Sequence, residues 1–170
     1  MRIVEPAAGR LLLATPLLRE AVFDRAVILL LDHGSEGSAG VVLNRPLEIQ
    51  ATEIGLESLG EVASPAVLFE GGPVETMGLV GVTTDEDGRV VPRDLDSTES
   101  RSPVRVYLGY SGWSAGQLAE ELEEGAWWVV DCGPDDAFTA EPLDLWFEVV
   151  GRFEDRRSWL KLMPSDPADN

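Results

Sequence analysis

Runs of apolar residues, separated by polar and glycine-containing segments, recur along the chain and predict β-strands. They are rich in valine, leucine and isoleucine and cover residues 10–15, 26–32, 40–43, 66–69, 78–83, 104–110 and 127–131. The run from Ala26 to Leu31 has no polar interruption. A strand of that kind is typical of a sheet with layers on both faces, so we expect it to be a central strand.

Three helices are also expected. One runs over residues 52–60, one starts at Ser114, and one runs from Pro142 toward Phe153. The second has the Ser-x-x-Gln spacing of a capping box, formed by Ser114 and Gln117. Between the strands, the Asp-Gly pair in residues 85–88 predicts a hairpin turn, because such turns need positive backbone dihedrals.

The grouping of strands with few helices between them predicts an α+β fold with a mixed, largely antiparallel sheet. A chain of 170 residues is long enough for one ordinary domain. We expect this domain to span residues 1–163, with residues 164–170 as a flexible tail because they are polar and proline-rich.

Charge narrows the possible partners. The chain has 31 acidic and 13 basic residues, a formal net charge of −18, and the acidic excess lies between residues 51 and 150. Such a composition disfavours direct contact with nucleic-acid phosphates or anionic lipid surfaces, both of which attract clustered Lys and Arg. A single cysteine, the absence of a signal-peptide pattern and the absence of an apolar run of about 20 residues predict a soluble cytoplasmic protein.

Residues 108–118 carry the most informative local pattern. They predict a strand, a glycine-bearing turn and a helix start, which is either a tight turn or a site for an anion. A P-loop is excluded because this segment has no lysine. Ser111 lies in a near match to a nucleophile elbow, with Trp113 where glycine is required, and the only histidine, His33, lies far upstream. A Ser111/His33 hydrolase therefore remains an alternative.

The remaining candidates are open to two interpretations. Arg45 could hold a carboxylate or phosphate by its planar fork, or it could form an internal ion pair. Gly71 and Gly72 permit close approach of the backbone to a ligand or to another strand. The acidic neighbours of Cys132 raise its expected pKa, which favours an inert packing residue. With one histidine and one cysteine, neither a metal site nor a cofactor site is expected.

Taken together and in order, these motifs resemble the bacterial YqgE/AlgH family. The resemblance rests on residues 9–16, 23–27, 33, 40–46, 71–74 and 108–118. It implies a small closed β-barrel core surrounded by helices and no specific activity, and some members are described as transcriptional regulators. Its motif residues give the candidate binding positions His33, Asn44, Arg45, Gly71, Gly72, Pro73, Tyr110, Gly112, Trp113 and Gln117.

The leading hypothesis is a non-enzymatic binding domain with an indirect regulatory role. Its binding surface would comprise the 33–46, 71–74 and 109–117 segments, which the sequence places at strand ends, and its ligand would be a small anion or a protein partner. The alternatives are a regulator that contacts DNA directly and the Ser111/His33 hydrolase.

Overall fold

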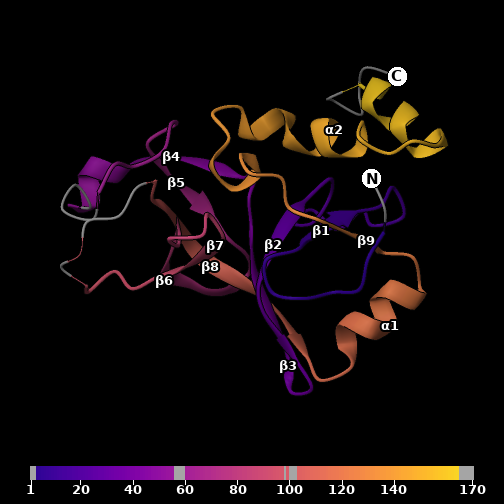
Figure 1. Ribbon diagram of the computed structural model, residues 1–170, viewed down its shortest axis with the longest axis horizontal. Coiled ribbons are helices and arrows are strands. Elements are labelled where there is room, and N and C mark those ends of the chain that lie inside the picture. The colour runs from indigo at the N-terminus through magenta and orange to yellow at the C-terminus, as the bar shows by residue number, and fades with distance from the viewer. Residues whose placement is uncertain (1–2, 56–59, 98, 100–102, 165–170) are drawn as a thin grey trace.

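The computed structural model describes residues 3–55, 60–97, 99 and 103–164 (Figure 1). Its strands are β1 (Leu11–Ala14), β2 (Val27–Gly34), β3 (Gly37–Val42), β4 (Pro46–Gln50), β5 (Val67–Glu70), β6 (Val74–Thr84), β7 (Val90–Arg93), β8 (Arg105–Ser114) and β9 (Trp127–Val130). The α-helices are α1 (Gln117–Glu123) and α2 (Leu145–Val150), and 3₁₀ segments cover Ala51–Ile54, Asp136–Phe138, Pro142–Asp144 and Arg156–Leu162. No helix in these ranges is long and apolar enough to cross a membrane.

The strands form one sheet of mixed direction. Its order is β4-β5-β8-β3-β2-β1-β9, and β6 pairs with both β8 and β7. The β5–β8 pair is parallel, whereas the other strand pairs are antiparallel. The predicted α+β fold with a largely antiparallel sheet is confirmed.

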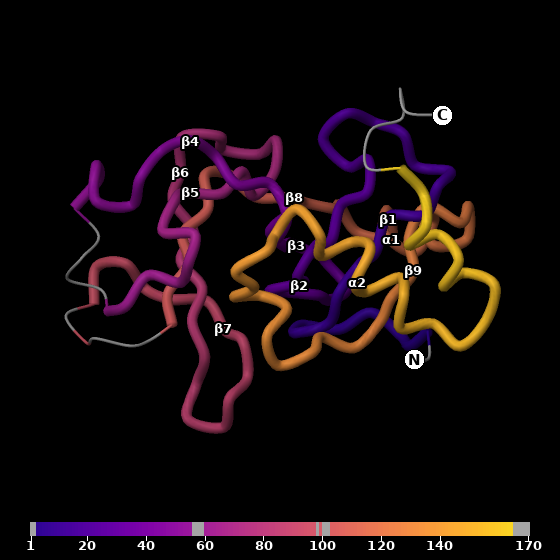
Figure 2. The backbone as a smooth tube through the Cα atoms, turned by 90° about the horizontal axis from the view of Figure 1, so that it is seen from above, coloured from indigo at the N-terminus to yellow at the C-terminus, as the bar shows by residue number. Residues whose placement is uncertain are grey.

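Strand β8 belongs to both halves of this sheet. Its first part pairs with β5 and β6, while Ser111 to Ser114 pair with β3. Figures 1 and 2 show the result: β4 to β7 gather on one side of the molecule, and β1, β9, α1 and α2 lie on the other. One long strand therefore joins two groups of strands.

The first half of β2, residues 27–30, is buried on both faces, as its apolar run predicts. Leu29 belongs to the core cluster that contains Trp146 of α2, and its neighbour Ile28 belongs to the cluster that contains Leu118 of α1. Successive side chains of a strand point to opposite faces, so α2 and α1 cover opposite faces of the β9-β1-β2-β3 region. Figure 1 shows α2 and α1 on either side of these strands.

The closed barrel implied by the family resemblance is wrong for this chain. The strand path begins at β4 and ends at β9, and the sheet does not close between them within the described residues. Helices cover both faces around β1 and β2, so the apolar side chains there are buried without closure of the sheet.

Local differences from the predicted elements are concentrated near glycines. Strand β8 continues to Ser114, and α1 begins at Gln117 after Gly116, which has a φ of 79°. Half of the expected capping box forms, since the Ser114 amide donates to Gln117 Oε1 at 3.0 Å. The predicted turn is confirmed between β6 and β7, where the Asp85 amide donates to the Arg89 carbonyl.

The other predicted helices differ in extent. The first is a 3₁₀ turn, Ala51–Ile54, that ends at Gly55, while residues 56–59 lie outside the described part of the chain. The third is present as a 3₁₀ segment that leads into α2. Most of the predicted tail, residues 165–170, also lies outside the described residues.

Candidate functional site

The motif segments meet where the β2–β3 hairpin lies beside β8. His33 pairs across the hairpin with Ser38, and Ser38 pairs with Trp113 of β8. On the other edge of β8, Tyr110 pairs with Val74, the residue that follows Pro73. Segments from three parts of the sequence are therefore adjacent in the sheet.

A pocket of about 560 Å³ lies at this meeting point. We call it the motif pocket; its lining residues are Asp32, Gly34, Ser35, Glu36, Gly37, Ser38, Ala39, Val74, Tyr110, Gly112 and Trp113. Asp32 and Glu36 are exposed, and the lining contains no arginine or lysine. The charge of the pocket wall is therefore negative.

Gly112 gives the motif pocket part of its depth. A Cβ atom at this position would lie 3.4 Å from the Tyr110 ring and 3.8 Å from the Val74 side chain. Both contacts are with side chains, and the backbone of Gly112 lies outside the left-handed region. A larger residue at Gly112 would thus fill the pocket without straining the backbone.

Trp113 forms the inner wall of the motif pocket, and Glu121 and Trp127 contact its ring. Its indole nitrogen donates to Glu121 Oε1 at 3.3 Å, and the Trp127 indole donates to the same oxygen at 3.2 Å. The two rings pack edge to face with centroids 6.1 Å apart. Trp113 is 6% exposed, so its main role in this structure is to join β8 to α1 and β9.

Gly71 and Gly72 bring two backbones together. A Cβ on Gly71 would lie 2.3 Å from the carbonyl oxygen of Gly109, and a Cβ on Gly72 would lie 2.3 Å from the carbonyl of Tyr110. Of the two interpretations that the sequence leaves open, the close approach is to a neighbouring strand. Pro73, the next residue, is exposed.

Asn44 and Arg45 lie outside the motif pocket, beyond the other end of β3. Asn44 is buried and connects two backbones: its Oδ1 accepts from the Val27 amide, and its Nδ2 donates to the Arg25 carbonyl. The half-buried Arg45 guanidinium donates to the carbonyls of Asp24 and Asn44. Burial lowers the pKa of Arg45, and nearby Asp24 and Glu70 oppose that shift.

Ser111 and His33 each have a different partner. The Ser111 hydroxyl is fully buried and donates to the Gly71 carbonyl at 3.1 Å. His33 is exposed, and its Nδ1 forms a 2.6 Å hydrogen bond with Ser38 Oγ. A nucleophile needs a base within hydrogen-bond reach and access to substrate, and the buried Ser111 hydroxyl has neither here.

Gln117 does not line the motif pocket. It lines a smaller cavity of about 310 Å³ behind Trp113, together with Glu20 and Glu120. Cys132 is half-buried, and burial together with nearby Asp136 raises the pKa of its thiol to about 12. Within the described residues, no three His, Cys, Asp or Glu side chains are grouped to hold a metal ion.

Sequence reasoning missed the two carboxylates of the motif pocket and a buried arginine. Asp32 lies near the end of β2 and Glu36 lies in the turn between Gly34 and Gly37. The two glycines so close together were the available signal for a hairpin. Arg105 is fully buried, and it donates to the carbonyls of Ser64, Ala137 and Thr139. Its position within an apolar run of valines was the only sign of burial.

Comparison with known proteins agrees with the motifs. A family model described as AlgH-like matches residues 11–157. A UPF0301 protein of Streptomyces avermitilis is 39% identical, with all of this chain and 98% of that protein covered. A UPF0301 protein of Thermobifida fusca is 36% identical over 95% of this chain and 94% of its own.

Two solved structures share the fold. A crystal structure of a protein from Corynebacterium diphtheriae superposes with a TM-score of 0.86 at 28% identity, covering 95% of this chain and 94% of the other. The solution structure of the AlgH protein from Pseudomonas aeruginosa gives a TM-score of 0.69 at 24% identity over 96% and 98% of the two chains. With the family match and the close relatives, these comparisons establish that the chain belongs to the AlgH-like family.

Proposed function

We propose that this chain is a non-enzymatic binding protein whose motif pocket receives a positively charged side chain, lysine or arginine, of a protein partner. The observation that carries the proposal is the pairing of two exposed carboxylates, Asp32 and Glu36, with the aromatic ring of Tyr110 around one pocket. Carboxylates and aromatic faces are the groups that bind cations.

The location of the pocket favours a macromolecular partner. Small-molecule sites usually bury most of their ligand, whereas the motif pocket lies beside an exposed hairpin tip, Gly34 to Glu36. A small anion is disfavoured because Arg45 lies elsewhere and the two carboxylates would repel it. The net charge of −18 likewise disfavours direct DNA contact, so we favour a protein as the partner.

Titration with short peptides, followed by the amide NMR spectrum of the labelled chain, tests the proposal. We expect acetyl-Ala-Lys-Ala-amide to shift the amide signals of residues 34–38 and 110–113, and the corresponding glutamate peptide to leave them unchanged. Removing both carboxylates, Asp32→Asn with Glu36→Gln, should weaken binding about fivefold, because an exposed ion pair contributes up to ~1 kcal/mol.

Two variants provide the controls. Glu86→Gln with Asp87→Asn changes the net charge equally at the exposed β6–β7 turn and should leave peptide binding unchanged. Gly112→Leu should block the pocket while the melting temperature stays close to that of the wild type, since its side-chain neighbours can move. Equal responses to the lysine and glutamate peptides, or none to either, would rule the proposal out.

A further inference from the structure

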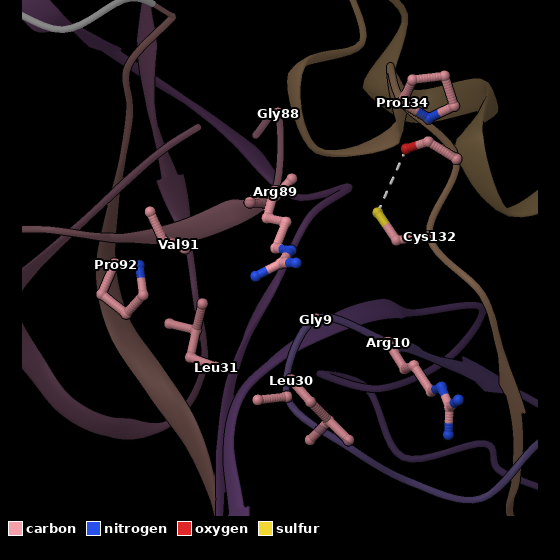
Figure 3. A pocket seen from close by; sticks show the side chains of 13 residues that line it. Gly9, Arg10, Leu30, Leu31, Gly88, Arg89, Val91, Pro92, Cys132 and Pro134 are labelled. Carbon is pink, nitrogen blue, oxygen red and sulfur yellow. Dashed lines mark hydrogen bonds between the residues drawn. The ribbon is translucent and has the colours of Figure 1, made fainter. Parts of the chain in front are cut away.

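A second pocket, of about 450 Å³, lies on another part of the molecule (Figure 3). We call it the β7 pocket; its lining residues are Ala8, Gly9, Arg10, Leu30, Leu31, Gly88, Arg89, Val90, Val91, Pro92, Cys132, Gly133 and Pro134. These residues come from the segment before β1, from β2, from the β6–β7 hairpin and from the segment after β9. It shares no lining residue with the motif pocket.

Much of the β7 pocket wall is apolar. Leu31 and Val90, both half-buried, pack against the core cluster around Leu29 and Trp146. Val91 and Pro92 extend this wall along β7, which pairs with β6 alone among the described strands. Proline has no amide hydrogen, so this edge of β7 is poorly suited to adding a peptide strand. A compact ligand suits the pocket better than an extended chain.

Arg89 is the free cation of the β7 pocket. In the described part of the chain its guanidinium has no hydrogen-bond or ion-pair partner. Figure 3 shows it extending from the β6–β7 turn into the space above Leu30. Arg10 differs, because its guanidinium donates to the Glu5 carbonyl and lies 3.5 Å from the Asp131 carboxylate. In Figure 3 it points away from Arg89.

We propose that the β7 pocket binds a small organic carboxylate. Its carboxylate would pair with the Arg89 guanidinium, whose planar fork matches the two oxygens, and its apolar body would lie against Leu31, Val91 and Pro92. The volume is within the range of small-ligand sites. Arg89 is also one of only 13 basic residues in a chain with 31 acidic residues.

Calorimetry and NMR titrations with four probes test the proposal on the full chain: hexanoate, hexanol, hexylammonium and inorganic phosphate. We expect hexanoate to bind and to shift the amide signals of Leu31 and Val91, with the other three binding at least about tenfold more weakly. Arg89→Gln should weaken hexanoate binding about tenfold or more, because it removes a charge-assisted hydrogen bond. Arg156→Gln is the matched control, since Arg156 is exposed outside the pocket and the variant has the same net charge.

Cys132 gives a second readout, because it is the only cysteine and lines the β7 pocket. Hexanoate should slow its reaction with methyl methanethiosulfonate in the wild type and in Arg156→Gln, but not in Arg89→Gln. The proposal is overturned if hexanol binds as tightly as hexanoate, if phosphate alone binds equally well, if the two arginine variants behave alike, or if hexanoate gives no shift near Leu31. None of these results bears on the lysine-peptide titration.

Discussion

Arg105 shows how this chain places a charge in its interior. The side chain is fully buried, and its two terminal nitrogens donate to three backbone carbonyls while the guanidinium lies over the ring of Phe69, 4.5 Å from the centroid. The buried Nε has no hydrogen-bond partner among the described residues. Burial lowers the pKa of Arg105 and raises that of the neighbouring Tyr107. Because one guanidinium contacts both Ser64 and residues 137–139, Arg105 connects β8 to two segments that are distant in sequence.

Arg105→Ala is therefore expected to lower the free energy of unfolding by about 3 kcal/mol, since several buried carbonyls lose their donor. Arg105→Lys retains the charge but not the planar guanidinium, so its free energy of unfolding should lie between those of the wild type and Arg105→Ala. Urea unfolding followed by tryptophan fluorescence measures both. Arg156→Ala, an exposed control, should change stability by less than about 0.5 kcal/mol. A wild-type stability for Arg105→Ala would contradict this role.

Cys132 should react slowly with alkylating reagents near neutral pH. Burial raises its thiol pKa to about 12, and only the thiolate reacts with iodoacetamide. At pH 8 we expect alkylation at least about a hundredfold slower than that of N-acetylcysteine, rising about tenfold per pH unit until the pH approaches 12. The raised pKa also means that ionisation of Cys132 favours the unfolded chain above about pH 9. A rate that levels off near pH 9 would refute the assignment.

The Gly71–Gly72 segment crosses β8 at close range, and this contact fixes the positions of β3 and β8 relative to each other. Gly109 has a φ of 71°, and an added Cβ there would lie 2.5 Å from the Gly72 carbonyl oxygen. The Gly71 carbonyl in turn accepts from the Val42 amide and from the Ser111 hydroxyl. Strands β3, β8 and the 71–72 segment therefore contact one another through backbone and small side chains.

Gly71→Ala is expected to cost about 3 kcal/mol of unfolding free energy, because its Cβ would meet the Gly109 carbonyl at 2.3 Å and the backbone must move. Gly34→Ala is a matched control, since nothing lies within 4 Å of its Cβ position. That variant should be neutral within about 0.5 kcal/mol. Chemical denaturation of both proteins provides the comparison, and equal costs would show that close packing at Gly71 is unimportant.

Apolar runs predicted the long strands because burial on both sides leaves a continuous hydrophobic pattern, as in β2. The same pattern is weak for β4 and β7, whose short sequences include Pro46 and Pro92. The glycines of β8 suggested a turn, yet the strand continues because β3, distant in sequence, supplies its hydrogen bonds. A local sequence pattern does not show which distant strand will supply these hydrogen bonds.

For the candidate site, some residues selected from the sequence share one pocket and others do not. Tyr110, Gly112 and Trp113 line the motif pocket, whereas Arg45 does not. The direction of β3 explains why Arg45 lies elsewhere. The strand begins at the hairpin tip near Gly37, and its six residues extend about 20 Å before Arg45 follows. A sequence motif shows that residues occur together along the chain, but the path of the strand decides which end of it they share.

The net charge of −18 should destabilise the folded chain, because its acidic side chains repel one another. We expect the melting temperature to rise by several degrees between about 10 mM and 150 mM sodium chloride, since added salt shortens the Debye length to about 8 Å. Differential scanning calorimetry measures the change, and potassium chloride should give the same rise if screening is the cause. A fall in melting temperature with salt would mean that attractive ion pairs outweigh the repulsion.

Strand β8 also bears on how the chain is synthesised. The earlier strands β3, β5 and β6 all depend on residues 105–114 for hydrogen bonds, and β1 depends on the still later β9. On the ribosome, none of these strands can complete its pairing until most of the chain has emerged. We expect folding to be largely post-translational and the unpaired nascent strands to be natural clients of chaperones.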